Sequence, residues 1–269
     1  MDLGLTGRRA LVTGGSKGLG RAIAAELVAE GADVAVCARH GDELERAADQ
    51  LRGGGGGGGA TGPGGRVLAR ACDVTDPKQV AGLVAAVAAE LGGLDILVNN
   101  AGGAHPGNFE TLTDADWHGD LDVKLFSQIR CTRAALPHLR DSPAPRVVNV
   151  NAVYGRYPDP AFFATTVNRA ACLNLTKALA IQLGPDGILV NSVNIGFVAT
   201  PQWANIRARQ APDLPEEQFF ASLAGREVPL GRFGRDDEVS GLVAFLASDR
   251  ASYITGASID VAGGMGRYV

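Results

Sequence analysis

The strongest constraint on the fold is an alternation, along the whole chain, of short β-rich segments with longer amphipathic ones. The short segments have the composition of strands and cover residues 10–13, 34–37, 67–69, 96–98, 147–150, 188–193 and 258–261. The longer segments carry apolar residues at helical spacing and cover residues 20–30, 42–52, 79–91, 117–139, 164–183 and 238–247. Strands that alternate with helices of this length predict right-handed β-α-β crossovers. The sequence therefore predicts an α/β fold, a doubly wound parallel sheet with helices on both faces.

The composition is that of a folded globular protein without a strong overall charge. Of 269 residues, 46% are hydrophobic and 20% charged, and the net charge is −4. Such a balance gives no positive field that would attract nucleic acid or anionic lipid. The sequence also shows no run near 18 apolar residues and no cationic start followed by an apolar core. We expect one domain over residues 1–269, with no export signal, membrane span or nucleic-acid partner.

The cysteines argue for a reducing environment. There are four, far apart and without a C-x-x-C pair: Cys37, Cys72, Cys131 and Cys172. This spacing favours buried thiols over a disulfide framework or a zinc site. We therefore expect a cytoplasmic protein without a bound metal.

Glycine is the one outlier of the composition. The chain has 37 glycines, and seven of them form the run Gly53 to Gly59. A stretch with so few side chains can bury almost nothing. Because the periodic pattern resumes unchanged beyond it, we expect a flexible surface loop at residues 53–65, inserted into the domain.

A second glycine-rich segment lies directly after the first strand. Residues 13–20 read Thr-Gly-Gly-Ser-Lys-Gly-Leu-Gly, and a helix is expected to open at Arg21. Glycines at this place allow a tight turn and a close approach of backbone amides to a pyrophosphate, while the helix dipole faces the anion. The strand-loop-helix context predicts a dinucleotide-binding loop rather than an ordinary turn.

The spacing T-G-x-x-x-G-x-G, together with the Asn-Asn-Ala-Gly run at residues 99–102, resembles the short-chain dehydrogenase/reductase family, and the resemblance spans essentially the whole chain. It implies a Rossmann fold in which residues 72–74 contact adenine and residues 191–200 cover the nicotinamide. Residues 253–256 and 260–264 resemble the C-terminal signature of the family. The cofactor-binding residues that the resemblance implies are Gly14, Ser16, Lys17, Gly18, Leu19, Gly20, Arg39, Asp73, Val74, Asn99, Ala101, Gly102, Gly196, Val198 and Thr200.

The end of the second strand predicts the choice of cofactor. Enzymes of this kind select NAD with a carboxylate there, which binds the ribose hydroxyls and repels a 2′-phosphate. This chain has Ala38, followed by Arg39, and Lys17 in the glycine loop adds a second cation. Two cations and no acid favour NADP (NADPH) over NAD. The alternative is that Arg39 stacks on adenine while Lys17 is solvated.

The catalytic set of the family is replaced. The resemblance places its serine, tyrosine, lysine and asparagine at Ala152, Thr165, Arg169 and Lys124. The family's separations, thirteen between the first two positions and four between the next two, are intact. A threonine has no usable acidic proton, and arginine stays charged at any accessible pH. The tyrosine-lysine chemistry of the family is therefore excluded at these positions.

Three nearby side chains are candidates for the missing acid. Tyr154 follows Ala152 by two residues, so strand alternation could aim it at the same side of the sheet end, and a nearby Arg169 would lower its pKa. Tyr157 lies in the same loop, and His105 follows the Asn-Asn-Ala-Gly turn where substrate loops begin. Each could instead be an ordinary loop residue. We expect Tyr154 to be the proton donor, with Thr165, Arg169 and Lys124 beside it.

Lys124 and Arg169 raise a question of charge. If both point inward, two cations lie near the nicotinamide without a carboxylate from the motif, and burying them unpaired is very unfavourable. Either an acidic side chain from elsewhere compensates them, or they bind a cofactor phosphate or a substrate carboxylate.

The expected function is that of an NADP-dependent oxidoreductase of the short-chain type, similar to 3-oxoacyl reductases, acting on a carbonyl or alcohol. The alternatives are a non-redox lyase, isomerase or dehalogenase-like catalyst, and a dinucleotide-binding sensor or structural protein without turnover. A lid near residues 200–230, with Trp203, Phe219 and Phe220, is apolar enough for a medium-sized organic substrate. The resemblance also implies a homotetramer, in which the helices at 117–139 and 164–183 pair across a two-fold axis.

Overall fold

Seven parallel strands form one sheet in the order β3-β2-β1-β4-β5-β6-β7. The computed structural model describes residues 2–53 and 65–266, except for the side chains of residues 209 and 210. The strands are β1 (Arg9–Thr13), β2 (Asp33–Ala38), β3 (Val67–Ala71), β4 (Ile96–Asn99), β5 (Arg146–Ala152), β6 (Leu189–Ile195) and β7 (Ser258–Val261). Each corresponds to a segment predicted from the sequence, which confirms the doubly wound α/β fold.

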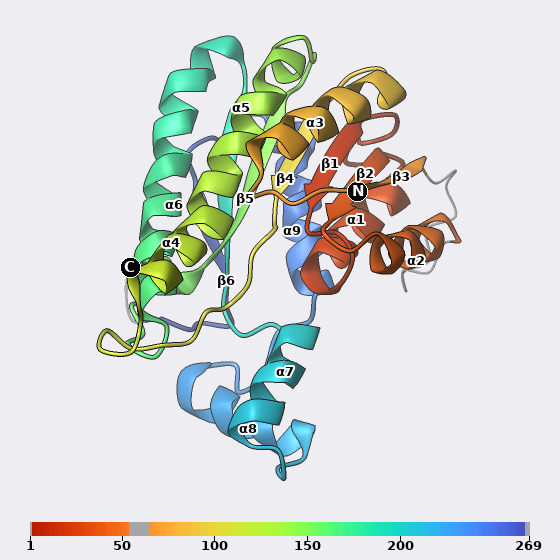
Figure 1. Cartoon of the computed structure of the whole chain (residues 1–269). Helices are drawn as coiled ribbons and strands as arrows, with labels where there is room; N and C mark the ends of the chain where they lie inside the picture. The colour runs from red at the N-terminus through yellow and green to blue at the C-terminus, as the bar shows by residue number, and fades with distance from the viewer. Residues whose placement is uncertain (1, 54–64, 267–269) are drawn as a thin grey trace.

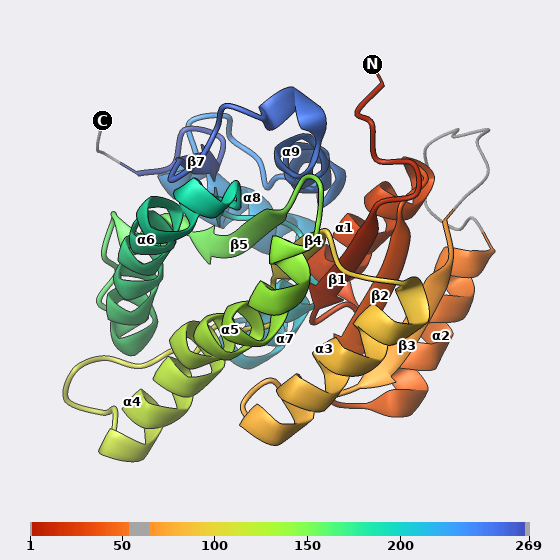
Figure 2. The same ribbon diagram turned by 90° about the horizontal axis from the view of Figure 1, so that it is seen from above.

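Helices cover both faces of this sheet (Figure 1). One face carries α1 (Gly18–Ala29), α2 (Gly41–Arg52) and α9 (Asp237–Ala247), and α1 packs against α9. The other face carries α3 (Pro77–Leu91), α5 (Ser127–Arg140) and α6 (Phe163–Leu183), with α3 and α5 side by side (Figure 2). No described helix is long and apolar enough to cross a membrane.

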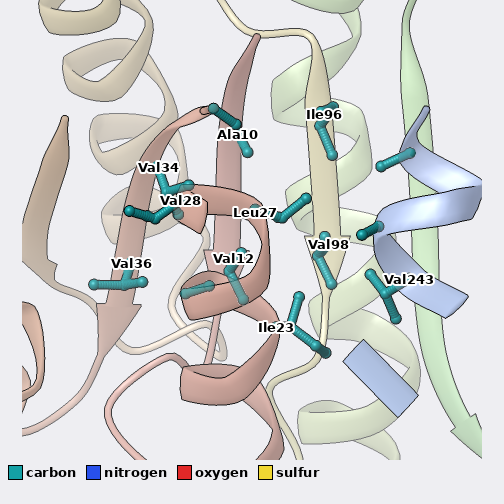
Figure 3. Close-up of a cluster of buried hydrophobic side chains, with 14 of the residues drawn as sticks. Ala10, Val12, Ile23, Leu27, Val28, Val34, Val36, Ile96, Val98 and Val243 are labelled. Atoms are coloured by element: carbon teal, nitrogen blue, oxygen red, sulfur yellow. The ribbon is translucent and has the colours of Figure 1, made fainter. Parts of the chain in front are cut away.

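The core lies between the sheet and these helices because neighbouring strands in the middle of a parallel sheet are buried on both faces. Figure 3 shows side chains of β1, β2 and β4 meeting those of α1 and α9, among them Val12, Ile23 and Val243. The four cysteines belong to the interior: all are free and buried. The prediction of buried thiols is thereby confirmed.

The helix expected at residues 117–139 is present, but it is not α-helical throughout. It consists of α4 (Asp114–Leu121), a π-helical turn η1 (Asp122–Phe126) and α5. Thr113 begins α4 with a capping box, in which its hydroxyl accepts from the Asp116 amide while the Asp116 side chain accepts from the Thr113 amide. Single π turns are rare and often occur at functional sites, and Lys124 lies in this one.

Two more helices lie in the expected lid segment. They are α7 (Pro201–Gln210) and α8 (Glu216–Glu227), and Figure 1 shows them set apart from the sheet at the bottom of the view. Trp203 and Phe220 pack there against Phe197 and Phe233. The expected surface loop at residues 53–65 cannot be compared in the same way, because residues 54–64 lie outside the described part of the chain.

The amino ends of the central strands are joined by an ion pair of which Asp95 is buried and Arg9 partly exposed. Asp95, directly before β4, binds the Arg9 guanidinium at the start of β1, at 2.6 Å between Oδ1 and Nη2. The Ser142 hydroxyl donates to the same carboxylate oxygen at 2.6 Å. Burial alone would raise the pKa of Asp95, but the hydrogen bonds from Arg9 and Ser142 outweigh it, and the pKa is lowered. The carboxylate thus holds β1, β4 and the loop before β5 together.

Candidate functional site

The glycine loop joins β1 to α1 at the carboxyl end of the sheet and has the shape of a phosphate cradle. Gly14 and Gly18 have φ angles of +70° and +51°, a region that favours glycine. A Cβ on Gly20 would lie 2.1 Å from the Gly14 carbonyl oxygen, and one on Gly15 would lie 2.7 Å from Val36. Only glycine fits these positions without a shift of the neighbouring atoms, so the loop can turn tightly and lead directly into the first turn of α1, whose N-terminus favours an anion.

The loop is fixed to the segment that follows β4. The Asn100 side-chain amide donates to the carbonyl oxygens of Thr13 at 2.9 Å and Gly14 at 3.2 Å. The Thr13 hydroxyl oxygen accepts in turn from the backbone amides of Asn100 and Ala101, both at 3.0 Å. Because β2 and β4 pair with opposite edges of β1, this is the topological switch point at which such sheets bind ligands.

Two of the other expected cofactor residues, Asp73 and Asn99, have side chains that are occupied within the protein. The Asp73 carboxylate accepts hydrogen bonds from Thr75 in its own loop. The bond from the Thr75 backbone amide is the largest cause that lowers the pKa of Asp73, and the Arg39 charge lowers it further. The Asn99 side chain points into the core, where its amide donates to Asn149 at 2.9 Å. Any contact of Asn99 with a cofactor must therefore use its backbone.

The remaining expected residues lie in or beside α1, β3, β6 and α7. Leu19 and Val74 are buried. A Cβ on Gly196 would lie 2.8 Å from the Ala262 side chain. Val198 is buried and bridges to Gly234, and Thr200 is the cap residue of α7.

An acid lies where the sequence predicted none. Glu43, in the first turn of α2, places its Oε1 atom 3.1 Å from the Lys17 Nζ atom. Its Oε2 atom accepts a hydrogen bond from the Ser16 hydroxyl at 3.2 Å. The Lys17 ammonium, through its hydrogen bond, is the largest cause that lowers the pKa of Glu43. The expectation that no acid accompanies the two cations is thus wrong for Lys17. The acid was missed because Glu43 lies 26 residues further along the sequence.

Two of the four positions at which the family resemblance places the catalytic set, Lys124 and Thr165, meet at a buried carboxylate, Asp120. Lys124 binds the Asp120 Oδ1 atom through its Nζ atom, and both side chains are almost fully buried. The Thr165 hydroxyl donates to the same oxygen at 3.2 Å, and the Asn168 side-chain amide donates to Oδ2 at 2.8 Å. An acidic side chain therefore compensates Lys124, as the first of the two alternatives above expected.

Arg169 has no such partner among the described residues. Its Nη1 atom donates to the Val150 carbonyl oxygen at 3.0 Å, and its Nε atom is buried without a hydrogen bond. A Cβ on Gly102 would lie 3.4 Å from the Nη2 atom. The guanidinium thus lies between the ends of β4 and β5, facing the segment that follows β4.

The surroundings of Lys124 lower its pKa to about 8. Burial is the largest cause, the Arg169 cation adds to it, and Asp120 acts in the opposite direction. An ammonium group with a pKa of about 8 can release its proton near neutral pH, which an ordinary lysine does not do.

Tyr154 is placed differently from the expectation. It follows β5 in a short 3-10 turn, and its ring stacks on Phe162 with 5.6 Å between centroids. Burial and then the Asp159 carboxylate raise the pKa of Tyr154. The expected lowering of its pKa by Arg169 is therefore wrong, because apolar packing and an anion surround the phenol instead.

The two other candidate acids lie nearer to solvent. His105 pairs with Asp116, with 3.2 Å between Nε2 and Oδ1, and 42% of its side chain is exposed. Its backbone amide donates to the Thr165 hydroxyl oxygen at 3.4 Å, so the loop after β4 does border the cluster. Tyr157 is half-buried in the loop between β5 and α6.

The site contains two carboxylates that reasoning from the sequence missed. Asp120 stands four residues before Lys124, a spacing that pairs opposite charges on a helix, so the pattern could have revealed it. Asn168 is adjacent to Arg169, but its contact with Asp120 spans 48 residues. Glu43 carries no such local signal.

Known proteins resemble this chain over nearly its full length. A family model described as enoyl-(acyl carrier protein) reductase matches residues 14–266. The oxidoreductase UcpA of Salmonella typhimurium is 36% identical over 97% of this chain and 95% of its own. An NADPH-bound short-chain oxidoreductase from Pseudomonas aeruginosa, described as containing an atypical catalytic center, is 39% identical with a TM-score of 0.87 and 97% of both chains covered. The L-sorbose reductase of Gluconobacter frateurii, in complex with NADPH and L-sorbose, is 31% identical with a TM-score of 0.94 and both chains fully covered.

Proposed function

The chain belongs to the short-chain dehydrogenase/reductase family, and on this premise we propose that it is an NADPH-dependent oxidoreductase that reduces a carbonyl group and takes the proton from Lys124. The observation that carries the proposal is the buried cluster in which Lys124, at one of the expected catalytic positions, binds Asp120 beside Arg169. It provides a transferable proton where the family's tyrosine is missing.

The residues present fit a dinucleotide. The glycine loop has the tight turns of a pyrophosphate-binding loop, with Gly14 and Gly18 at positive φ, and the buried Nε atom of Arg169 lacks a hydrogen-bond partner among the described residues. In this proposal the loop and the start of α1 hold the pyrophosphate, Arg39 binds the 2′-phosphate, and Arg169 binds the nicotinamide ribose. The NADPH complexes of the two similar structures support the choice of cofactor. NADPH, when bound, supplies the hydride.

Charge balance explains why Lys124 is a suitable acid. Before the transfer the cluster contains two cations and one carboxylate. After Lys124 has given its proton to the substrate oxygen, the Arg169 guanidinium and the Asp120 carboxylate balance each other. Because burial penalises a net charge, the transfer relieves the cluster of an uncompensated cation. Asp120 acts as a positioning residue, since it holds the Lys124 ammonium and is itself held by Thr165 and Asn168.

The test combines binding and turnover. A titration with NADPH, monitored by cofactor fluorescence, should show binding. A panel of ketones, 3-oxoacyl thioesters and sugars, monitored by NADPH absorbance, should then show oxidation of the cofactor. Absence of NADPH binding at millimolar concentration would contradict the proposal.

One observation favours a second candidate, a dinucleotide-binding protein without turnover. Thr165 replaces the tyrosine and is engaged with Asp120. Tight NADPH binding without oxidation across the panel would support this candidate.

We extend the proposal to the organisation of the protein. Residues 1–269 form one domain, with α7 and α8 as a lid whose aromatic residues suit an apolar substrate portion. The free, buried cysteines suit a cytoplasmic protein. The exposed apolar side chains of Val167 and Ile181 on α6 support a homotetramer in which this helix meets a second copy.

A further inference from the structure

The contact between Glu43 and Lys17 lies in the region assigned to the ribose of the cofactor. Ser16 and Lys17 belong to the glycine loop, and the Gly15 amide donates to the Cys37 carbonyl oxygen near the end of β2 at 3.0 Å. Arg39 follows β2 directly, and α2 begins two residues later. The loop, the end of β2 and the first turn of α2 therefore meet at one place, where dinucleotide-binding sheets discriminate a ribose hydroxyl from a phosphate.

Glu43 neutralises the cation that a 2′-phosphate needs. Its two oxygens lie 3.1 and 3.4 Å from the Lys17 Nζ atom, and one of them also accepts from Ser16. A phosphate that binds Lys17 must displace this carboxylate and then lie close to its charge. A ribose hydroxyl has neither cost, and it can donate a hydrogen bond to the carboxylate.

We propose that Glu43 is a specificity-determining residue that holds Lys17 back from the 2′-phosphate, lowers the affinity for NADPH and keeps NADH usable as a second cofactor. The inference rests on the proposed function and deepens it. In this view Arg39 attracts the 2′-phosphate, while Glu43 prevents Lys17 from adding to that attraction.

The expected size of the effect follows from exposure. The Lys17 side chain is 62% exposed and that of Glu43 35%. Exposed ion pairs of this kind change an equilibrium by roughly fivefold at most, and loss of repulsion with the phosphate adds a similar factor. Glu43→Gln should therefore tighten NADPH binding about 3- to 10-fold, while NADH binding stays the same or weakens.

The experiment measures dissociation constants for NADPH and NADH by cofactor fluorescence, at low and high salt. The matched control is Glu45→Gln, which removes the same charge from the same helix but from a side chain that pairs with Arg52. The control should change both affinities by less than about twofold. The gain of Glu43→Gln should shrink at high salt.

A double-mutant comparison tests the route through Lys17. In a Lys17→Met background the gain from Glu43→Gln should fall to half or less, because the cation to be released is gone. A gain of full size in that background, or equal effects of Glu43→Gln and Glu45→Gln, would overturn the inference. Failure of the unmodified protein to bind either cofactor would overturn the proposed function together with it, whereas normal NADPH binding that Glu43→Gln leaves unchanged would overturn the inference alone.

Discussion

The properties of Lys124 depend on its surroundings. An exposed lysine holds its proton far above neutral pH. Burial and the Arg169 cation bring the pKa of Lys124 to about 8, and Asp120 keeps it from falling further. A lysine on the surface would keep its proton at neutral pH and could not act as an acid there.

The pH dependence of carbonyl reduction should follow Lys124. The donor must be protonated, so the rate should be constant below about pH 8 and fall about tenfold for each pH unit above it. Steady-state rates at saturating cofactor between pH 6 and 10 measure this. A rate that stays flat through pH 10 would assign the proton to another group.

Lys124→Arg separates charge from proton transfer. Arginine keeps the cation beside Asp120 but cannot release a proton. Turnover should drop by about 10²-fold or more, with NADPH affinity changed less than about threefold. Circular dichroism and the NADPH titration serve as controls for folding, and normal turnover in this variant would contradict the assignment.

Tyr154→Phe distinguishes the phenol from Lys124 as the acid. Because burial and Asp159 raise the pKa of Tyr154, we expect turnover to stay within about threefold of the unmodified protein. A loss of about 10²-fold with intact cofactor binding would restore Tyr154 as the proton donor.

At the scale of elements, polar side chains at both ends of the strands fix how the loops meet. At the carboxyl ends, Asn100 and Thr13 tie the glycine loop to β4. At the amino ends, Asp95 ties β1 to β4 through Arg9. The π-helical turn at residues 122–126 contains Lys124 at the point where the helix packs against α6.

Asp95→Asn should destabilise the protein by about 2 kcal/mol at pH 7, between the values for exposed and fully buried pairs, because it leaves the partly exposed Arg9 without its carboxylate. The pKa of Asp95 is lowered in the folded state, so its contribution is complete above the unfolded value near 4 and is lost as the pH falls through the folded value. Urea unfolding at fixed protein concentration should show the difference at pH 7 and a smaller one at pH 3. Asp49→Asn, at an exposed position on α2, is the control.

At the scale of the whole molecule, apolar side chains remain on the outer surface of α6. Val167 is 48% exposed and Ile181 70%. Both lie on the helix that the family resemblance assigns to a two-fold interface. Their burial against a second copy would remove this apolar surface from water.

Light scattering at micromolar concentration should give about 111 kDa, four times the chain mass of 27.7 kDa. Ile181→Glu should shift the protein to smaller species, because a charge would be buried in the interface. Arg46→Glu on α2 should leave the mass unchanged. A monomeric mass for the unmodified protein would remove the proposal of a tetramer.

The sequence alone determined the order of the strands, the helices that cover the sheet and the glycine loop, because periodicity, glycine spacing and short motifs are local properties of the chain. The four replaced catalytic positions remain a prediction from the family resemblance. The sequence could not determine the partners of the charged groups. Glu43 reaches Lys17 across 26 residues, and Thr165 and Asn168 reach Asp120 across 45 and 48. The surroundings of Tyr154 likewise depend on how the loop after β5 packs against Phe162 and Asp159. Only the tertiary structure decided these contacts, because charge interactions and burial depend on distances in space. The crossovers between the strands determine those distances.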